Sequence, residues 1–206
     1  MISLKSKYII MKRTFTILFA AFLVTTGFAQ ENKATDSSWK KSPRYTPDRI
    51  NNLVHTKLDV KFDYNNSYLI GKAWVTLTPH FDATSTLILD AKGMEIKKLA
   101  LVAANNSIKD LQYNYNKEQL TVQLDKVYKK GQKYTIYVDY VAKPDEYEKE
   151  SERDPALGIK GLYFINPKGE DKNKPIQIWT QGETESNSVW FPTIDQTQQK
   201  TTQELY

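Results

Sequence analysis

The 206-residue sequence contains no cysteine and only two histidines, His55 and His80. Without cysteine, the chain can form neither a disulfide bond nor a thiolate metal site. The two histidines are far apart in sequence and neither is followed by glutamate, so we interpret them as ordinary surface or edge residues. No set of three zinc ligands with recognisable spacing is present, and neither is a Gly-x-Ser-x-Gly motif or a glycine-rich phosphate loop. These classes of catalytic centre are therefore not supported.

Negative charge is missing from the first 29 residues, whose four charged side chains are all positive: Lys5, Lys7, Lys12 and Arg13. The formal net charge of the whole chain is +5, from 29 basic and 24 acidic residues. Without those four (29 − 4 = 25 basic, 24 acidic) the net charge is +1. A near-neutral domain with no basic stripe lacks the electrostatic signature of a nucleic-acid-binding protein.

The most apolar stretch, Phe15–Val24, is shorter than the ~20 residues that a membrane-spanning helix needs. It follows the basic segment Met11–Arg13 and precedes small residues at Gly27 and Ala29, which is typical of a secretory signal peptide. We predict cleavage after Ala29, with residues 1–10 as an upstream extension, and therefore a periplasmic or secreted protein. A buried core helix or an uncleaved anchor is the alternative.

Residues 30–50 are polar and contain two prolines, so we interpret them as a linker or extended lead-in. Residues 51–206 contain no convincing helical period but many segments with alternating apolar and polar residues. In the first, Leu58, Val60 and Phe62 alternate with charged side chains. The predicted strands are 57–64, 70–78, 86–90, 94–103 with a bulge at Lys97–Lys98, 111–115, 119–124, 133–141, 161–165, 176–180 and 201–206. This pattern predicts an all-β fold, an antiparallel sandwich or barrel-like sheet.

The acidic segment Asp145–Asp154 interrupts this pattern between Pro144 and Pro155. We predict a mobile, solvated loop, because lysine and arginine are interleaved with the acids and no calcium-loop spacing is present. A cation site is the alternative.

The stretch Ile176–Asp195 has the most informative sequence. It begins as a strand, continues into a polar loop that carries Glu183 and Glu185, and closes on the aromatic segment Trp190-Phe191-Pro192. A carboxylate loop held at both ends by bulky apolar residues could present a negative charge to a ligand. A solvated surface loop is the alternative.

Thr180-Gln181-Gly182-Glu183, followed by Phe191-Pro192 and Asp195, resembles a signature of the zinc aminopeptidases of the alanyl-aminopeptidase type. This gluzincin family also includes leukotriene hydrolase. The similarity extends over residues 53–206, in the order Leu69-Ile70-Gly71, Leu87–Ala91 and Gly161-Leu162-Tyr163. The chain departs from the family at Thr193, where many members have cysteine, and at Thr197 and Gln203, where they have proline and phenylalanine.

The resemblance implies the N-terminal β-domain of such an enzyme, an antiparallel sandwich or saddle-like sheet, with Gln181 and Glu183 as substrate-binding residues. In the family, this glutamate holds the free α-amino group of a peptide in the active-site cleft of the next domain. The family also requires zinc, held by a His-Glu-x-x-His helix that this sequence lacks. We therefore expect no catalytic or metal-ligating residues in this chain, and no peptidase activity from it alone.

The final residues, Thr201–Tyr206, look like the start of a strand, so we expect the chain to be a fragment that stops before the catalytic domain. The expected partners are that missing domain and peptides with a free N-terminus, but neither nucleic acid nor a membrane span. One alternative is a non-catalytic secreted β-sandwich that binds carbohydrate or protein, with Trp39, Trp74 or Trp179 as sugar platforms. Another is a catalytically inactive scaffold of the same fold.

Overall fold

The computed structural model describes residues 48–151 and 159–206. The predicted signal peptide (1–29) and most of the predicted lead-in (30–50) lie outside these residues. The first strand described starts at Asn51, six residues before the first predicted strand. Among the residues described, no helix is long and apolar enough to span a membrane.

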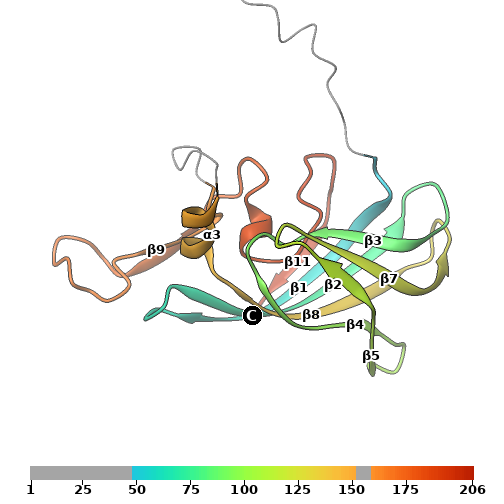
Figure 1. The fold of residues 1–206 in the computed structure, drawn as a ribbon, viewed down its shortest axis with the longest axis horizontal. Coiled ribbons are helices and arrows are strands. Elements are labelled where there is room, and N and C mark those ends of the chain that lie inside the picture. The colour runs from blue at the N-terminus through green and yellow to red at the C-terminus, as the bar shows by residue number, and fades with distance from the viewer. Residues whose placement is uncertain (1–47, 152–158) are drawn as a thin grey trace, which may run out of the picture. The chain divides into compact units, whose positions relative to one another are not determined.

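The described residues form eleven strands and one short α-helix (Figure 1). In chain order they are β1 Asn51–Asp63, β2 Tyr68–Pro79, β3 Thr84–Asp90, β4 Glu95–Val102, β5 Ile108–Asp110, β6 Tyr113–Tyr115, β7 Gln119–Tyr128, β8 Tyr134–Ala142, α3 Pro144–Glu150, β9 Leu162–Ile165, β10 Gln177–Thr180 and β11 Thr202–Leu205. The all-β prediction is confirmed.

The strands form three sheets. Six strands lie in the order β11-β1-β2-β8-β4-β5, three in the order β3-β7-β6, and β9 pairs with β10. All pairs are antiparallel except β11, which lies parallel to β1. That parallel edge was not predicted.

A single core joins the six-stranded and three-stranded sheets, because each presents one apolar face to the other. On β2 and β8, alternate residues such as Val75 and Val138 are fully buried, and so are Leu87 on β3 and Leu120 on β7. Burying one such side chain contributes about 1.5–3 kcal/mol. The alternation seen in the sequence therefore identified the faces of the sheets correctly.

Several local predictions are confirmed. The register of β4 shifts between Ile96 and Lys98, which is the expected bulge. The predicted strands 111–115 and 119–124 correspond to β6 and β7, which form a hairpin in which the side chain of Asn116 accepts hydrogen bonds from the backbone of Glu118 and Gln119 (2.9 and 2.7 Å). The prediction missed β5, a strand of only three residues.

The prediction of a solvated loop in the acidic segment was wrong. Residues 144–150 form α3, not a solvated loop, and the aromatic ring of Tyr147 is buried beneath it. Proline occupies the start of the helix and acidic residues its first turn, both of which suit a helix N-terminus. Asp145 and Glu148 bind the Lys160 amine at 3.0 and 2.9 Å. A helix of two turns is too short to show the periodicity that was sought.

Candidate substrate-anchoring site

Gln181 and Glu183 lie in the loop that leaves β10. The backbone N–H of Gln181 donates to the carbonyl of Gly161 (2.9 Å), which extends the β9–β10 ladder one residue past Thr180. The Gln181 amide nitrogen lies 3.5 Å from a carboxylate oxygen of Glu183, and the Glu183 side chain is exposed. The structure thus places the two predicted residues side by side, with Gln181 half-buried and Glu183 exposed.

Two glycines allow the loop to pack tightly on itself. Gly161 has a φ of +68°, and a Cβ atom there would overlap the carbonyl oxygen of Ser186. A Cβ atom on Gly182 would overlap the side chain of Asn187. Only glycine fits such close approaches without displacing its neighbours. Gly182, which the signature contains, therefore has a packing role, and the sequence alone did not reveal it.

Asp195 fixes the far side of the loop, where residues Asn187–Val189 form one 3₁₀ turn. The buried backbone N–H of Ser188 donates to the Asp195 carboxylate (2.8 Å), and so does the Asn187 amide (3.3 Å). The backbone N–H of Asp195 in turn donates to the carboxylate of Asp90 at the end of β3 (3.0 Å). The conspicuous aspartate of the signature therefore holds the loop in shape.

Lys92 is a contributor that sequence reasoning missed. Its side chain is buried, and its ammonium donates to the carbonyl of Glu185 (2.6 Å), while its backbone N–H donates to the carbonyl of Ser188 (2.8 Å). A single lysine after a strand gives no sequence signal for such a role.

The aromatic segment attaches the loop to the core, as expected. Phe191 is only 3% exposed, and Trp190 packs against it edge-on with ring centres 4.4 Å apart. The hydroxyl of Tyr140, on β8, donates to the carbonyl of Trp190 (3.1 Å). Thr193 forms a two-hydrogen-bond bridge with Asp90 (2.7 and 3.0 Å). The carboxylates of Glu183 and Glu185 are thus exposed on a loop that is fixed at both ends.

The described residues do not fit a zinc site, because they contain no group of three His, Cys, Asp or Glu side chains placed to hold a metal. His55 lies on β1, with its ring nitrogen 2.8 Å from the Thr202 hydroxyl. His80 follows β2 and packs against the ring of Phe81. Among the residues that the structure describes, neither histidine has a hydrogen bond, ion pair or ring contact with the loop that carries Glu183.

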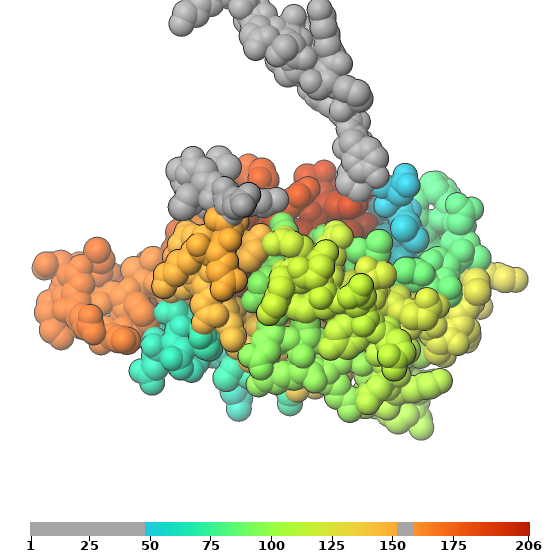
Figure 2. Space-filling model, viewed as in Figure 1, coloured from blue at the N-terminus to red at the C-terminus, as the bar shows by residue number. Residues whose placement is uncertain are grey.

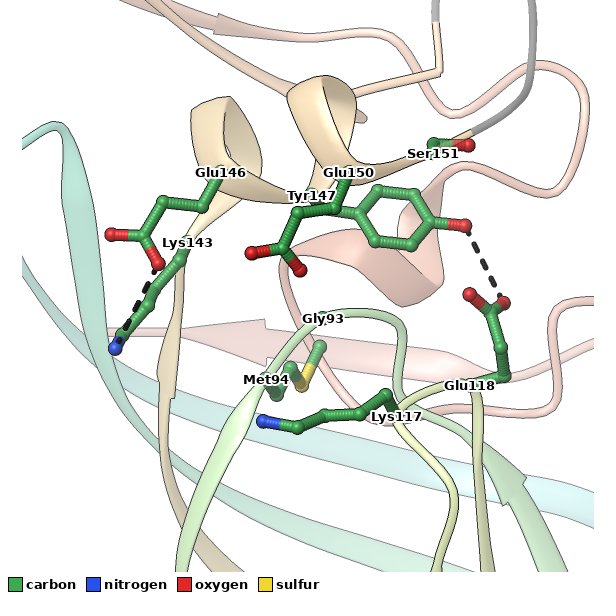
Figure 3. A pocket seen from close by; sticks show the side chains of 9 residues that line it. All are labelled: Gly93, Met94, Lys117, Glu118, Lys143, Glu146, Tyr147, Glu150 and Ser151. Carbon is green, nitrogen blue, oxygen red and sulfur yellow. Dashed lines mark hydrogen bonds and ion pairs between the residues drawn. The ribbon is translucent and has the colours of Figure 1, made fainter.

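A separate pocket of about 250 Å³ lies beside α3. Figure 3 shows Tyr147 with its hydroxyl directed toward Glu118 (3.4 Å) and Lys143 directed toward Glu146 (3.9 Å). The residues that line this pocket include neither Gln181 nor Glu183, so the pocket is not part of the predicted site.

Comparison with known proteins identifies the family to which this β-domain and its carboxylate loop belong. Residues 49–206 match the Peptidase M1 N-terminal domain, so the chain belongs to the M1 peptidase family. No curated protein matches it.

Solved structures with a similar fold include M1 zinc metallopeptidases and yeast LTA4 hydrolase. A two-domain M1 zinc metallopeptidase mutant with bound L-tryptophan is 16% identical, with a TM-score of 0.60 over 77% of this chain and 32% of that one. The M1 zinc metallopeptidase mutant from Deinococcus radiodurans bound to a Tyr-Ser-Ala substrate is 15% identical, with a TM-score of 0.59 over 76% and 32%. Yeast LTA4 hydrolase is 17% identical, with a TM-score of 0.56 over 82% and 26%. This chain therefore spans about a third or less of their lengths.

Proposed function

We propose that this domain is the substrate-anchoring part of an exported zinc metallo-aminopeptidase, which removes N-terminal amino acids from peptides. The observation that carries the proposal is the exposed Glu183 carboxylate beside Gln181, on a loop fixed to the core of an M1 N-terminal domain. A structural relative solved with a bound tripeptide substrate supports a peptide ligand.

Glu183 would bind the α-ammonium group of the substrate, and Gln181 would donate or accept a hydrogen bond next to it. A charge-assisted hydrogen bond of this kind contributes about 1.5–3 kcal/mol. Anchoring the first amino group sets the distance to the first peptide bond, so that bond and no internal one would be positioned for attack. The zinc ligands would belong to a part of the full-length protein beyond the residues described here.

The loop suits this role because contacts within the domain hold its backbone. Lys92 and Asp195 hold its backbone from two sides, and Phe191 is buried in the core. A carboxylate on a preorganised loop loses little conformational entropy when it binds, which strengthens discrimination between free and blocked amino groups.

The test is Glu183→Gln in the full-length enzyme, with aminoacyl anilides as substrates. We expect kcat/KM to fall by about ten- to a hundredfold, because the change keeps the shape and removes the charge. Glu185→Gln is the matched control, since Glu185 is equally exposed on the same loop and contacts Lys92 through its backbone only. Unchanged turnover after Glu183→Gln, or an equal loss in both variants, would refute the assignment.

Two further expectations belong to the proposal. Residues 30–206 purified alone should release no N-terminal amino acid from peptides, with or without added zinc. Export should remove the first 29 residues, so N-terminal sequencing of the mature protein should begin at Gln30. A mature protein that retains Met11 would contradict cleavage after Ala29.

A further inference from the structure

An exposed aromatic pair lies on the hairpin that leads into the Gln181–Glu183 loop. Trp179 on β10 and Tyr163 on β9 are cross-strand partners, and their rings stack with centres 4.7 Å apart and an interplanar angle of 19°. Trp179 is 46% exposed although it is among the largest apolar side chains in the domain.

This pair is not needed by the core. Side chains alternate along a strand, and it is Ile178, between Gln177 and Trp179, that packs against the hydrophobic core. Trp179 therefore faces the other way. Its ring has Tyr163 as a stacking partner on one side and solvent access on the remainder.

The pair and the proposed anchor share a strand face. Gln181 stays within the β9–β10 ladder through its hydrogen bond to Gly161, so Gln181 and Trp179 are two residues apart on one extended strand. Such positions project to the same side and lie about 6.6 Å apart. A distance of this size is within reach of aromatic and other long side chains.

We propose that Trp179 and Tyr163 form the subsite that receives the side chain of the substrate's first residue, and that this subsite favours large apolar and aromatic side chains. The inference rests on the proposed function, because it takes the amino group bound at Glu183 as its reference point. An ammonium held at Glu183 would direct the first side chain, attached at the adjoining carbon, toward the strand face that Gln181 shares with the stacked rings.

A cation already lies over the Tyr163 ring, which leaves less aromatic surface for a basic side chain at this subsite. Cations do bind aromatic faces, but the Lys160 ammonium already lies 5.8 Å from the Tyr163 ring centre. Because Asp145 and Glu148 balance the charge of Lys160 at 3.0 and 2.9 Å, it is occupation of the Tyr163 ring, and not repulsion, that disfavours a second cation. An aromatic side chain of the substrate would be stabilised by offset stacking on the pair, and any apolar side chain would be stabilised by removing the exposed indole surface from water.

The test is Trp179→Ala in the full-length enzyme, assayed with Phe-, Leu-, Lys- and Ala-anilides. We expect kcat/KM for the Phe and Leu substrates to fall about tenfold while that for the Ala substrate stays within twofold. Tyr163→Phe, which retains the ring, should keep the wild-type Phe-to-Ala ratio. The competitive inhibition constants of free L-phenylalanine and L-alanine should show the same selective change.

Trp74→Ala is the matched control, since Trp74 is also paired with a cross-strand tyrosine, Tyr137, but on the six-stranded sheet. It should leave the Phe-to-Ala ratio unchanged, and thermal unfolding of both variants shows whether either change affects folding. An equal loss for all substrates in Trp179→Ala, or a selective loss for the Lys substrate, would overturn the inference. If Glu183→Gln lowers turnover but Trp179→Ala leaves the ratio unchanged, the subsite fails while the proposed function stands.

Discussion

Asp195 offers the sharpest test of how the loop is held. In Asp195→Ala the backbone N–H of Ser188 loses its acceptor at 2.8 Å, and the Asn187 amide loses a partner at 3.3 Å. A hydrogen bond to a charged group contributes about 1.5–3 kcal/mol, and a buried donor left unpaired costs about 1–3 kcal/mol. Both values describe the same Ser188 N–H, so they cannot simply be added. We expect the free energy of unfolding to fall by about 3 kcal/mol.

Urea unfolding of the purified chain, followed by circular dichroism, measures this loss. With a denaturant slope of about 2 kcal/mol/M, the midpoint should fall by about 1.5 M. Asp195→Asn keeps one acceptor oxygen and should lose roughly half as much. The control is Asp110→Ala, whose side chain is 76% exposed and lies 3.3 Å from the Lys98 amine, and which should cost under ~0.5 kcal/mol. Equal midpoints for Asp195→Ala and Asp110→Ala would refute the reasoning.

Three further changes have definite expected outcomes. Gly161→Ala should destabilise the domain by more than about 2 kcal/mol in the same urea assay, because a Cβ there meets Ser186 and φ is positive. Burial and the charge of Arg49 lower the pKa of His80, so the neutral ring is favoured in the folded state. The stability it contributes is present above its unfolded pKa of ~6.5 and is lost as pH falls through the folded value; His80→Gln should reduce that acid sensitivity. Burial lowers the pKa of Lys160, but hydrogen bonds from its ammonium to the α3 carboxylates outweigh this and raise the pKa overall. Its contribution is therefore complete below ~10.4 and lost at higher pH, and Lys160→Met should speed amide exchange in α3 at neutral pH without altering the β-sheet amides.

The sheets could be predicted from sequence because each strand carries its own periodic signal. Val75 and Val138, for example, follow the two-residue alternation that one buried face imposes. The bulge near Lys98 was visible as a change of phase in the same signal. In contrast, α3 contains only one buried aromatic residue, Tyr147, and its acidic residues suggest a loop when Lys160 is not known to bind them.

For the site, motif similarity located Gln181 and Glu183, and the structure shows their side chains adjacent, with that of Glu183 exposed. Their role in binding substrate stays a prediction. The supports of the loop were harder to find, because Lys92 reaches Glu185 from a distant part of the chain and no local pattern marks that contact. Long-range contacts through single side chains depend on the final packing of sheets, which periodicity does not encode.

The parallel pairing of β11 with β1 has a consequence for synthesis of the protein. His55 and Thr202 contact each other across 147 residues, and β11 covers the outer side of β1 in the six-stranded sheet. While the chain emerges from the ribosome, β1 has β2 on one side and an open edge on the other until Thr202–Leu205 have been made. Until those residues have been made, the outer edge of β1 has no strand partner, and an unpaired strand edge is a template for aggregation.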